Sequence, residues 1–248
     1  MSNIIVIGAS SGMGREIART YAARGHRVGA CARRADRLHE LKSEYDANIT
    51  TCVLDVTADD AADIFDRFVT TMGGLDILIY CAGCGWNNPQ LDPEKDMRTV
   101  RTNVDGLTAI LGTAFNILAT QGPASLRRGQ IAVLTSIAGT RGIGISATYS
   151  ASKRYQWTYL EALAQLARVR NVPVDITDIR PGFVDTPLLD TTAHNYPMLM
   201  SLEEATAHVI NAIDRRRHAV VINCRWAVLT AIWRRIPRPL WRNFKLKF

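Results

Sequence analysis

The chain has 248 residues, of which 47% are hydrophobic and 21% are charged, proportions that are typical of a globular protein and exclude a disordered chain. The net charge of +7 lies at one end, because seven of the 30 basic residues fall in residues 225–248, where there is no acid. The rest of the chain balances 23 basic against 23 acidic residues. We therefore expect one neutral domain over residues 1–224 and a basic extension over residues 225–248.

The first expected strand, residues 3–7, is a short apolar run without alternation, as in a strand buried on both faces of a sheet. It is too short, and lacks the basic flank, to be a signal peptide or a spanning helix, so we expect a cytoplasmic protein. A glycine-rich turn with the spacing G-x-x-x-G-x-G follows, and then a helical pattern. Backbone N–H groups of such a turn can approach a phosphate group, although a purely structural turn is the alternative. The turn residues predicted to bind a cofactor are Gly8, Ser10, Ser11, Gly12, Met13 and Gly14.

The second expected strand, residues 27–31, is followed by Ala32, Arg33 and Arg34. A protein that prefers NAD usually places an acid here to hold the ribose hydroxyls. A guanidinium group can instead pair with a 2′-phosphate. The sequence therefore predicts NADP(H) in preference to NAD(H), with Arg33 as the first contact and Arg34 as the second. A solvated position at the start of a helix is the alternative for Arg34.

Strands and helices alternate along the rest of the chain. Further strands are expected at residues 49–54, 75–80, 130–135, 174–179 and 219–223. Helices are expected at residues 59–71, in a long segment that begins at 92–94 and contains Asn103, and at 147–168 and 201–215. This alternation predicts an α/β fold, a Rossmann-type doubly wound parallel sheet of about seven strands with helices on both faces.

Residues suited to chemistry follow the strands, and in a parallel sheet these positions share one edge. Asp55 and Val56 follow the third strand, a small-residue loop at 81–83 follows the fourth, and Ser136 follows the fifth. Tyr149 and Lys153 lie one turn apart on the expected helix 147–168. An ammonium group beside a phenol favours the phenolate, so we expect a tyrosine pKa below its reference value of about 10. Such a tyrosine can exchange a proton with a substrate oxygen near neutral pH.

Taken together, these motifs resemble those of the short-chain dehydrogenase/reductase family over about residues 3–223. They are Gly8-x-x-x-Gly12-x-Gly14, Asp55-Val56, Ala82-Gly83, Asn103, Ser136, Tyr149-x-x-x-Lys153 and Pro181-Gly182. The resemblance implies hydride transfer between a nicotinamide and a carbonyl or secondary alcohol, as in a carbonyl reductase or alcohol dehydrogenase. It also implies a homodimer or homotetramer that pairs through the long helices.

The same resemblance implies individual roles. Tyr149 matches the catalytic acid/base, and Lys153 matches the residue that lowers the tyrosine pKa and binds the nicotinamide ribose. Ser136 matches the hydroxyl group that positions the substrate carbonyl, and Asn103 matches the helix residue that holds a water in the proton relay. Cofactor contacts are further implied for Asp55, Val56, Ala82, Gly83, Pro181, Gly182, Val184 and Thr186.

Two positions depart from the family pattern. Ile7 stands where the family usually has threonine, and Cys81 replaces the asparagine of an Asn-Ala-Gly loop. Both positions are supporting, so we expect altered stability or cofactor affinity and intact chemistry. Cys81 and Cys84 have the spacing of a redox pair, but Gly83 and Gly85 indicate a loop, and we favour reduced thiols. The five cysteines show no metal-ligand spacing, so no metal is expected.

The substrate is expected to be a fairly apolar ketone or alcohol. By position, the candidate pocket walls are Trp86, Ile137, Ile143, Phe183, Leu188, Leu189 and Met198, all of which could equally be core residues. The irregular segment 188–200 is a candidate lid. Two other functions remain open: a cofactor-binding regulator without turnover, and a sugar-modifying enzyme on the same fold.

The basic extension has aromatic residues at helical spacing. Trp226, Leu229, Trp233 and Ile236 recur among arginines, and Trp241 and Phe244 follow two prolines. Such an amphipathic segment can lie peripherally on an anionic membrane. The alternative is a helical extension that packs on the body or on a second subunit. Nucleic-acid binding is not expected, because no nucleic-acid-binding module accompanies the charge.

Overall fold

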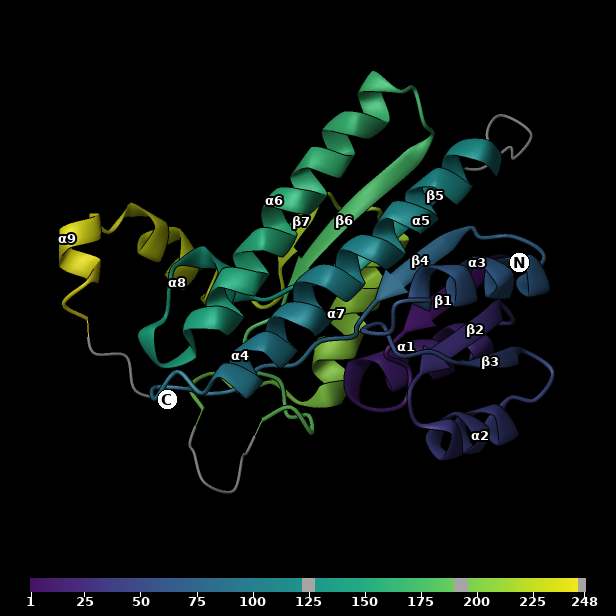
Figure 1. Ribbon diagram of the computed structural model, residues 1–248, viewed down its shortest axis with the longest axis horizontal. Helices are drawn as coiled ribbons and strands as arrows, with labels where there is room; N and C mark the ends of the chain where they lie inside the picture. Colours follow the sequence, from purple (N-terminus) through teal and green to yellow (C-terminus); the bar gives the residue numbers. More distant parts are fainter. Residues whose placement is uncertain (122–127, 190–195, 245–248) are drawn as a thin grey trace.

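The computed structural model describes residues 1–121, 128–189 and 196–244. Within these residues the chain forms a seven-stranded parallel sheet covered by helices on both faces, with the strand order β3-β2-β1-β4-β5-β6-β7 (Figure 1). The strands are β1 (Asn3–Ile7), β2 (Arg27–Ala32), β3 (Ile49–Val53), β4 (Ile77–Tyr80), β5 (Gly129–Leu134), β6 (Val174–Arg180) and β7 (Ala219–Val221). The α-helices are α1 (Gly12–Ala23), α2 (Ala35–Glu44), α3 (Ala61–Met72), α4 (Pro93–Val100), α5 (Gly106–Gln121), α6 (Ala147–Val169), α7 (Leu202–Asp214), α8 (Cys224–Arg235) and α9 (Arg238–Trp241). The predicted fold class is confirmed.

Each face of the sheet has its own hydrophobic core. One core joins the strands to α1, α2 and α7, and the other joins them to α3, α5 and α6. Successive side chains of a strand point to opposite faces, so β1 contributes Ile4 and Val6 to the first core and Ile5 and Ile7 to the second. This double burial explains why the strand is continuously apolar in sequence.

The strand order reverses between β1 and β4. From β1 the chain builds outward to β3 and then crosses back to β4 on the other side of β1. In open α/β sheets the crevice at such a reversal, outside the carboxyl ends of the strands, is where ligands bind. The glycine-rich turn after β1 and the small-residue loop after β4 therefore meet at this crevice.

The long helix expected around Asn103 is interrupted at that residue. α4 ends at Val100, a π-helical segment η1 (Arg101–Asp105) follows, and α5 begins at Gly106. A π-helical segment widens one turn of a helix and often occurs at functional sites. Asn103 lies in the middle of η1 and is fully buried. A Cβ atom at Gly106 would overlap the carbonyl oxygen of Val56, so glycine lets this helix approach the loop after β3.

The basic extension begins with α8, which packs against the body of the domain. The indole of Trp226 lies on Gly182 and meets the ring of Phe183 edge-on, with the ring centroids 5.5 Å apart. The guanidinium group of Arg141 donates hydrogen bonds to main-chain carbonyl oxygens at the end of α8, those of Trp233, Arg234 and Ile236. Lys245 and Lys247, which contribute to the predicted basic character, lie outside the described residues. None of the described helices is long and apolar enough to cross a membrane.

The candidate lid, residues 188–200, is described only at its ends, because residues 190–195 lie outside the described residues. The C-terminal end of this segment is hydrogen-bonded to the loop after β6. The N–H of Met200 donates to the carbonyl oxygen of Phe183 at 3.0 Å, and the N–H of Asp185 donates to the carbonyl oxygen of Met200 at 3.0 Å. Met200 is buried in the core that contains α7.

Candidate functional site

A cleft of about 710 Å³ runs along the carboxyl ends of the strands. Every residue predicted from the sequence to contact cofactor or substrate lines this cleft, apart from Asn103 and Met198. One end is formed by the glycine-rich turn, Arg33 and Arg34, and Ser136, Tyr149 and Lys153 converge further along it. The topology thus brings together residues that are more than 100 positions apart in the sequence.

The glycine-rich turn owes its shape to close backbone approaches. Gly8 has a positive φ of 90°, and a Cβ atom there would lie 2.8 Å from the backbone nitrogen of Ala82. A Cβ atom at Gly14 would overlap the carbonyl oxygen of Gly8. α1 begins at Gly12, within this turn, and its first N–H groups and positive dipole end form a site that can hold a phosphate group.

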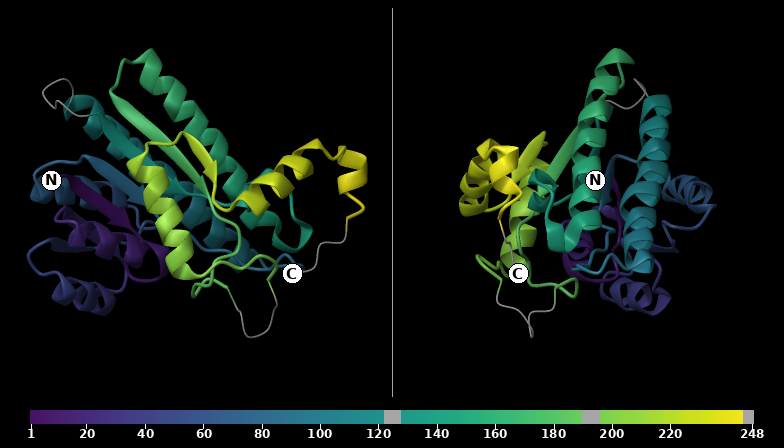
Figure 2. Two further views of the ribbon diagram at one scale, coloured as in Figure 1. Left: turned by 180° about the vertical axis from the view of Figure 1, so that it is seen from behind. Right: turned by 60° about the vertical axis from the view of Figure 1, so that its left-hand side comes forward.

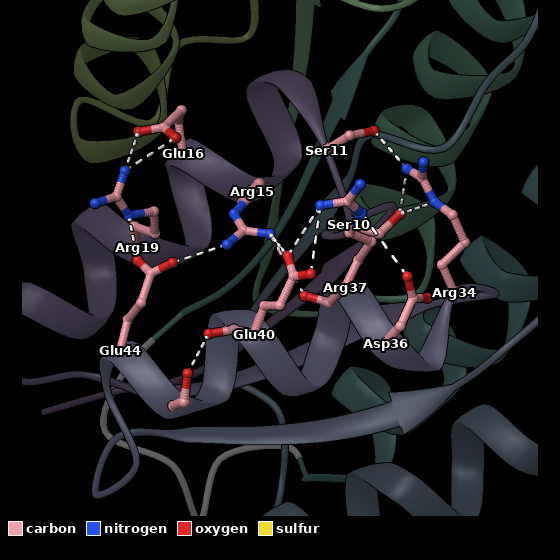
Figure 3. A network of polar contacts seen from close by, with 11 residues as sticks. Ser10, Ser11, Arg15, Glu16, Arg19, Arg34, Asp36, Arg37, Glu40 and Glu44 are labelled. Carbon is pink, nitrogen blue, oxygen red and sulfur yellow. Dashed lines mark hydrogen bonds and ion pairs between the residues drawn. The ribbon is translucent and has the colours of Figure 1, made fainter.

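Arg34 reaches from the start of α2 to the glycine-rich turn (Figure 3). Its Nη2 atom donates hydrogen bonds to Ser10 Oγ at 2.9 Å and to Ser11 Oγ at 2.8 Å. Arg33 points elsewhere, since its Nη1 atom lies 4.0 Å from Asp55 Oδ2 and its side chain is 58% exposed. Both arginines line the cleft, but Arg34, predicted as the second contact, is the one that touches the turn.

The positive charges of two neighbouring arginines are balanced by ion pairs, in contrast to that of Arg34. Arg15 and Arg19 on α1 form ion pairs with Glu44 of α2, each at 2.8 Å (Figure 3). In the described part of the chain, no carboxylate forms an ion pair with Arg34. Its positive charge is therefore available to an anionic group bound beside the turn.

Tyr149 and Lys153 lie on the first turns of α6 and face the cleft, as their spacing predicted. The Nζ atom of Lys153 is 5.6 Å from the centroid of the Tyr149 ring. It donates a hydrogen bond to Gln156 Oε1 at 3.1 Å. A Cβ atom at Gly85 would overlap the ring of Tyr149, so the loop after β4 packs directly against the tyrosine. These contacts hold both side chains in defined positions.

The expected lowering of the Tyr149 pKa is wrong for the protein alone. Burial raises the pKa of the phenol, because a phenolate without water is disfavoured, and a hydrogen bond with Ser136 acts in the opposite direction. Burial also lowers the pKa of Lys153 to about 8, and this effect outweighs the nearby side chains of Cys84, Asp178 and Cys81, which act in the opposite direction. The loss of hydration thus outweighs the attraction between ammonium and phenolate that the sequence suggested.

Asn103 stands behind the cleft and organises its wall. Its side-chain amide donates to the carbonyl oxygen of Cys84 at 2.8 Å and to Ser152 Oγ at 3.0 Å, and its Oδ1 accepts from the N–H of Cys84 at 3.0 Å. Its main-chain oxygen accepts from Gln156 Nε2 at 2.9 Å. Asn103 therefore ties the loop after β4 to α6, and Gln156 connects it to Lys153.

Gln156 was not identified from the sequence. It is fully buried and bridges Lys153 and Asn103 through the two ends of its amide. Its position three residues after Lys153 on the same helix was the available signal. A second unpredicted group lies behind Ser136, where Thr135 donates to Asp178 Oδ1 at 2.6 Å and Trp157 donates to Thr135 Oγ1 at 3.1 Å.

The two departures from the family pattern lie at the carboxyl ends of β1 and β4, where both residues line the cleft. Ile7 is 1% exposed, and its carbonyl oxygen accepts a hydrogen bond from the N–H of Cys81 at 2.8 Å. Burial raises the pKa of the Cys81 thiol to about 12, so this cysteine stays protonated. All five cysteines are free thiols. In the described residues, no group of His, Cys, Asp and Glu side chains is arranged to hold a metal ion.

The end of the cleft beyond Tyr149 is walled by apolar and aromatic side chains. Of the predicted pocket walls, Met198 does not line the cleft, and the other six do. Three aromatic residues complete the wall without having been assigned to it from the sequence: Tyr196, Trp226 and Trp233. Two of them belong to α8, whose tryptophans were interpreted only as part of an amphipathic extension.

The arrangement can orient a carbonyl or hydroxyl oxygen and exchange a proton with it. A buried, protonated phenol can donate to a substrate oxygen, and the Ser136 hydroxyl group lies within hydrogen-bonding contact of the same phenol. The Lys153 ammonium group beside the ring favours negative charge at this position when it develops.

Comparison with known proteins agrees with the fold. A family model described as short chain dehydrogenase matches residues 2–197. An uncharacterized oxidoreductase of Myxococcus xanthus is 34% identical over 242 residues, covering 95% of this chain and 93% of that protein. A short chain dehydrogenase from Burkholderia cenocepacia, solved in complex with NADP, has a TM-score of 0.82 at 20% identity over 99% of this chain and 98% of its own.

A further solved structure, the bulky-bulky ketone specific alcohol dehydrogenase from Comamonas testosteroni, has a TM-score of 0.76 at 19% identity. It covers 100% of this chain and 96% of its own. At this identity the two solved structures are evidence for the fold alone. The family model matches well over half of the chain, and the relative from Myxococcus matches nearly all of it. The chain is therefore an oxidoreductase of the short-chain dehydrogenase/reductase family.

Proposed function

We propose that the chain is an NADP(H)-dependent oxidoreductase that transfers a hydride between the nicotinamide and a carbonyl or secondary alcohol. The observation that carries this proposal is the convergence of Ser136, Tyr149 and Lys153 in one cleft whose other end is a glycine-rich turn. When bound, the nicotinamide cofactor supplies the hydride. The protein binds and orients both reactants and handles the proton of the substrate oxygen.

In the direction of reduction, the phenol of Tyr149 gives its proton to the carbonyl oxygen. Its raised pKa keeps it protonated at neutral pH, which is the form that a proton donor needs. Ser136 holds the same oxygen, and the Lys153 ammonium group stabilises the phenolate that remains. Asn103 supports Lys153 through Gln156, and it holds the loop at Cys84 in place. Whether it also holds a water of a proton relay stays a prediction.

NADP(H) is favoured over NAD(H) by the charge beside the glycine-rich turn. Arg34 and Arg33 line that end of the cleft, and among the described residues the guanidinium group of Arg34 pairs with hydroxyl groups and with no carboxylate. A 2′-phosphate would supply the missing negative charge. The relative from Burkholderia, which was solved with NADP, agrees with this choice.

The expected result for cofactor choice is tighter binding of NADPH than of NADH. Arg34→Ala should weaken NADPH binding by roughly tenfold and leave NADH binding nearly unchanged, because only NADPH carries the phosphate that a charge-assisted hydrogen bond would hold. Arg37→Ala is the matched control, since Arg37 lies on the same helix and pairs with Glu40 outside the cleft. Cofactor fluorescence titration measures both constants, and equal affinities in the unmutated protein would contradict the assignment.

The substrate is proposed to be a lipophilic small molecule. The part of the cleft beyond Tyr149 is walled by Phe183, Trp226 and Trp233, among other apolar side chains. Apolar walls with few polar groups favour ligands that bury aromatic or aliphatic surface. The Comamonas alcohol dehydrogenase, described as specific for bulky-bulky ketones, has the same fold.

The function is tested by a screen of NADPH oxidation with ketones, steroids, quinones and keto-sugars. Bulky apolar ketones should be reduced faster than keto-sugars, since the cleft offers them apolar surface and offers sugar hydroxyls few partners. Tight NADPH binding with no turnover on any carbonyl would instead favour a regulator that only binds the cofactor. Preference for keto-sugars would contradict the lipophilic assignment.

Self-association is proposed from the long helices. α6 exposes Leu166 and Val169, which are 38% and 73% exposed, and α4 exposes Met97 at 49%. Pairing of the long helices would cover these side chains, and a homodimer or homotetramer is the expected state. Light scattering of the intact protein measures this, and a monomeric mass would exclude it.

A further inference from the structure

Helix α8 has two faces with different partners. Trp226, Thr230 and Trp233 recur at helical spacing on the face turned toward the body, where Trp226 is 1% and Thr230 2% exposed. Val228 and Ile232 lie on the opposite face and are 62% and 54% exposed. Since α8 is only three turns long, the same short element both lines the cleft and presents apolar side chains to solvent.

The inner face is held firmly to the body. The indole Nε1 of Trp241, just beyond α8, donates to the carbonyl oxygen of Gly142 at 2.8 Å. Arg141 donates to carbonyl oxygens at the end of α8 and its guanidinium carbon lies 5.9 Å from the ring centroid of Trp241. Trp226, Trp233 and Trp241 also contact one another in sequence, with ring centroids 6.3 Å and 5.7 Å apart. The outer face therefore has a fixed orientation relative to the cleft.

Exposed apolar and basic side chains continue beyond α8 onto α9 and the residues that follow it. Leu240 and Phe244 are 58% and 55% exposed and extend the apolar side chains of α8. Exposed arginines accompany them, namely Arg225, Arg234, Arg235, Arg238 and Arg242, and residues 225–248 contain no acid. We call the set of Val228, Ile232, Leu240, Phe244, Arg225, Arg235, Arg238 and Arg242 the α8–α9 surface. Figure 2 shows α8 and α9 projecting from the body, on the side away from α2 and α3.

We propose that the α8–α9 surface docks onto an anionic lipid surface and thereby brings the apolar wall of the cleft close to the membrane. Exposed apolar side chains among arginines are the combination that inserts into a headgroup region while pairing with anionic lipids. Because Trp226 and Trp233 on the other face of α8 line the cleft, docking brings the cleft wall to the lipid. Delivery of a lipophilic substrate rests on the proposed function, whereas docking itself does not.

The charge of this surface favours lipid over a second copy of the chain. In a two-fold symmetric dimer the same patch faces itself, so the arginines of one copy would face those of the other. Like charges facing each other across an interface oppose association. An anionic bilayer presents the complementary charge. It also accepts the exposed apolar side chains, which would otherwise stay in water.

Sedimentation of the intact chain with vesicles tests the docking. Vesicles of phosphatidylcholine with about a third phosphatidylglycerol should bind the protein, pure phosphatidylcholine should bind it far less, and added salt should weaken binding. The double variant Val228→Asp/Ile232→Asp should lose binding by roughly tenfold or more, since it replaces inserted apolar groups with anions. Arg235→Glu/Arg238→Glu should lose binding to a similar degree, because it reverses charge and leaves the apolar groups intact.

The matched control is Thr70→Asp/Thr71→Asp. It adds the same two negative charges at exposed positions of α3, which lies on the side of the body away from α8 and α9. It should bind vesicles like the parent. NADPH binding and thermal unfolding of every variant distinguish lost docking from lost folding, and they are independent of turnover. The proposal is overturned if the intact chain does not bind anionic vesicles or if Val228→Asp/Ile232→Asp binds them as well as Thr70→Asp/Thr71→Asp does. If the intact chain does not bind vesicles and Val228→Asp/Ile232→Asp has a lower molecular mass in solution than the intact chain, the partner of this surface is a second copy of the chain.

Discussion

Replacing Tyr149 with phenylalanine is expected to lower turnover by roughly a thousandfold while leaving NADPH binding nearly unchanged. The phenol supplies the proton for the substrate oxygen, and a positioned acid typically contributes a factor of this order. The ring should stay in place, because it packs against Gly85 and is held by the first turns of α6. Steady-state rates and a separate NADPH titration measure the two effects.

Tyr155→Phe is the control for this experiment. Tyr155 lies on the same helix, and its hydroxyl group shares a hydrogen bond of 2.7 Å with Thr108 Oγ1 away from the cleft. It should keep its turnover within a factor of about two, since an exposed hydrogen bond contributes little. Undiminished turnover in Tyr149→Phe would refute the proposed role of the phenol. A parallel loss of NADPH binding would show that the tyrosine only shapes the cofactor site.

Lys153→Met is expected to lower the rate of ketone reduction at neutral pH by about a hundredfold. Methionine keeps the buried apolar stem but removes the positive charge that stabilises the phenolate. The change also leaves Gln156 Oε1 without its donor, so thermal unfolding should be measured alongside activity. The rate constant kcat/KM for the ketone is the relevant quantity, because it reports on the enzyme form that binds the ketone.

The pH dependence gives this variant its specific signature. Burial lowers the pKa of Lys153 to about 8, so the ammonium form predominates below that pH and is lost as the pH rises through it. In the unmutated protein kcat/KM for reduction should be level near neutral pH and fall about tenfold per pH unit above this pKa. The fall should vanish in Lys153→Met and persist in Lys95→Met, which removes an exposed lysine of α4. A profile that keeps its fall in Lys153→Met would assign the titration to another group.

The sheet and its edge could be predicted because they follow from local patterns. Residues 3–7 are apolar without alternation, since both faces of a central parallel strand are buried, and this marks a strand without any alignment. Once the strands are parallel, the positions that follow them must share one edge, which is why Ser136 and the glycine-rich turn were expected to line the same cleft. The register of Tyr149 and Lys153 needed only the helical repeat.

Properties that depend on distant neighbours could not be predicted. The π-helical turn at Asn103 depends on Cys84, Ser152 and Gln156, which come from two other segments of the chain. The sequence also could not show whether Arg33 or Arg34 reaches the glycine-rich turn, because this depends on the direction of the backbone at the start of α2. The strand lengths differed from expectation only by one or two residues at their ends, where pairing with a neighbour decides where a strand stops.

By itself, the sequence determined the order of the elements, the shared edge of the sheet and the identity of the chemical groups along it. These follow from hydrophobic periodicity and turn chemistry, which are local. Only the tertiary structure decided the electrostatics of Tyr149 and Lys153, because burial depends on everything packed around a group and here outweighs the attraction of the pair. It also decided that Trp226 and Trp233 of the basic extension complete the cleft, since packing of α8 on Gly182 joins two parts of the chain that no local pattern connects.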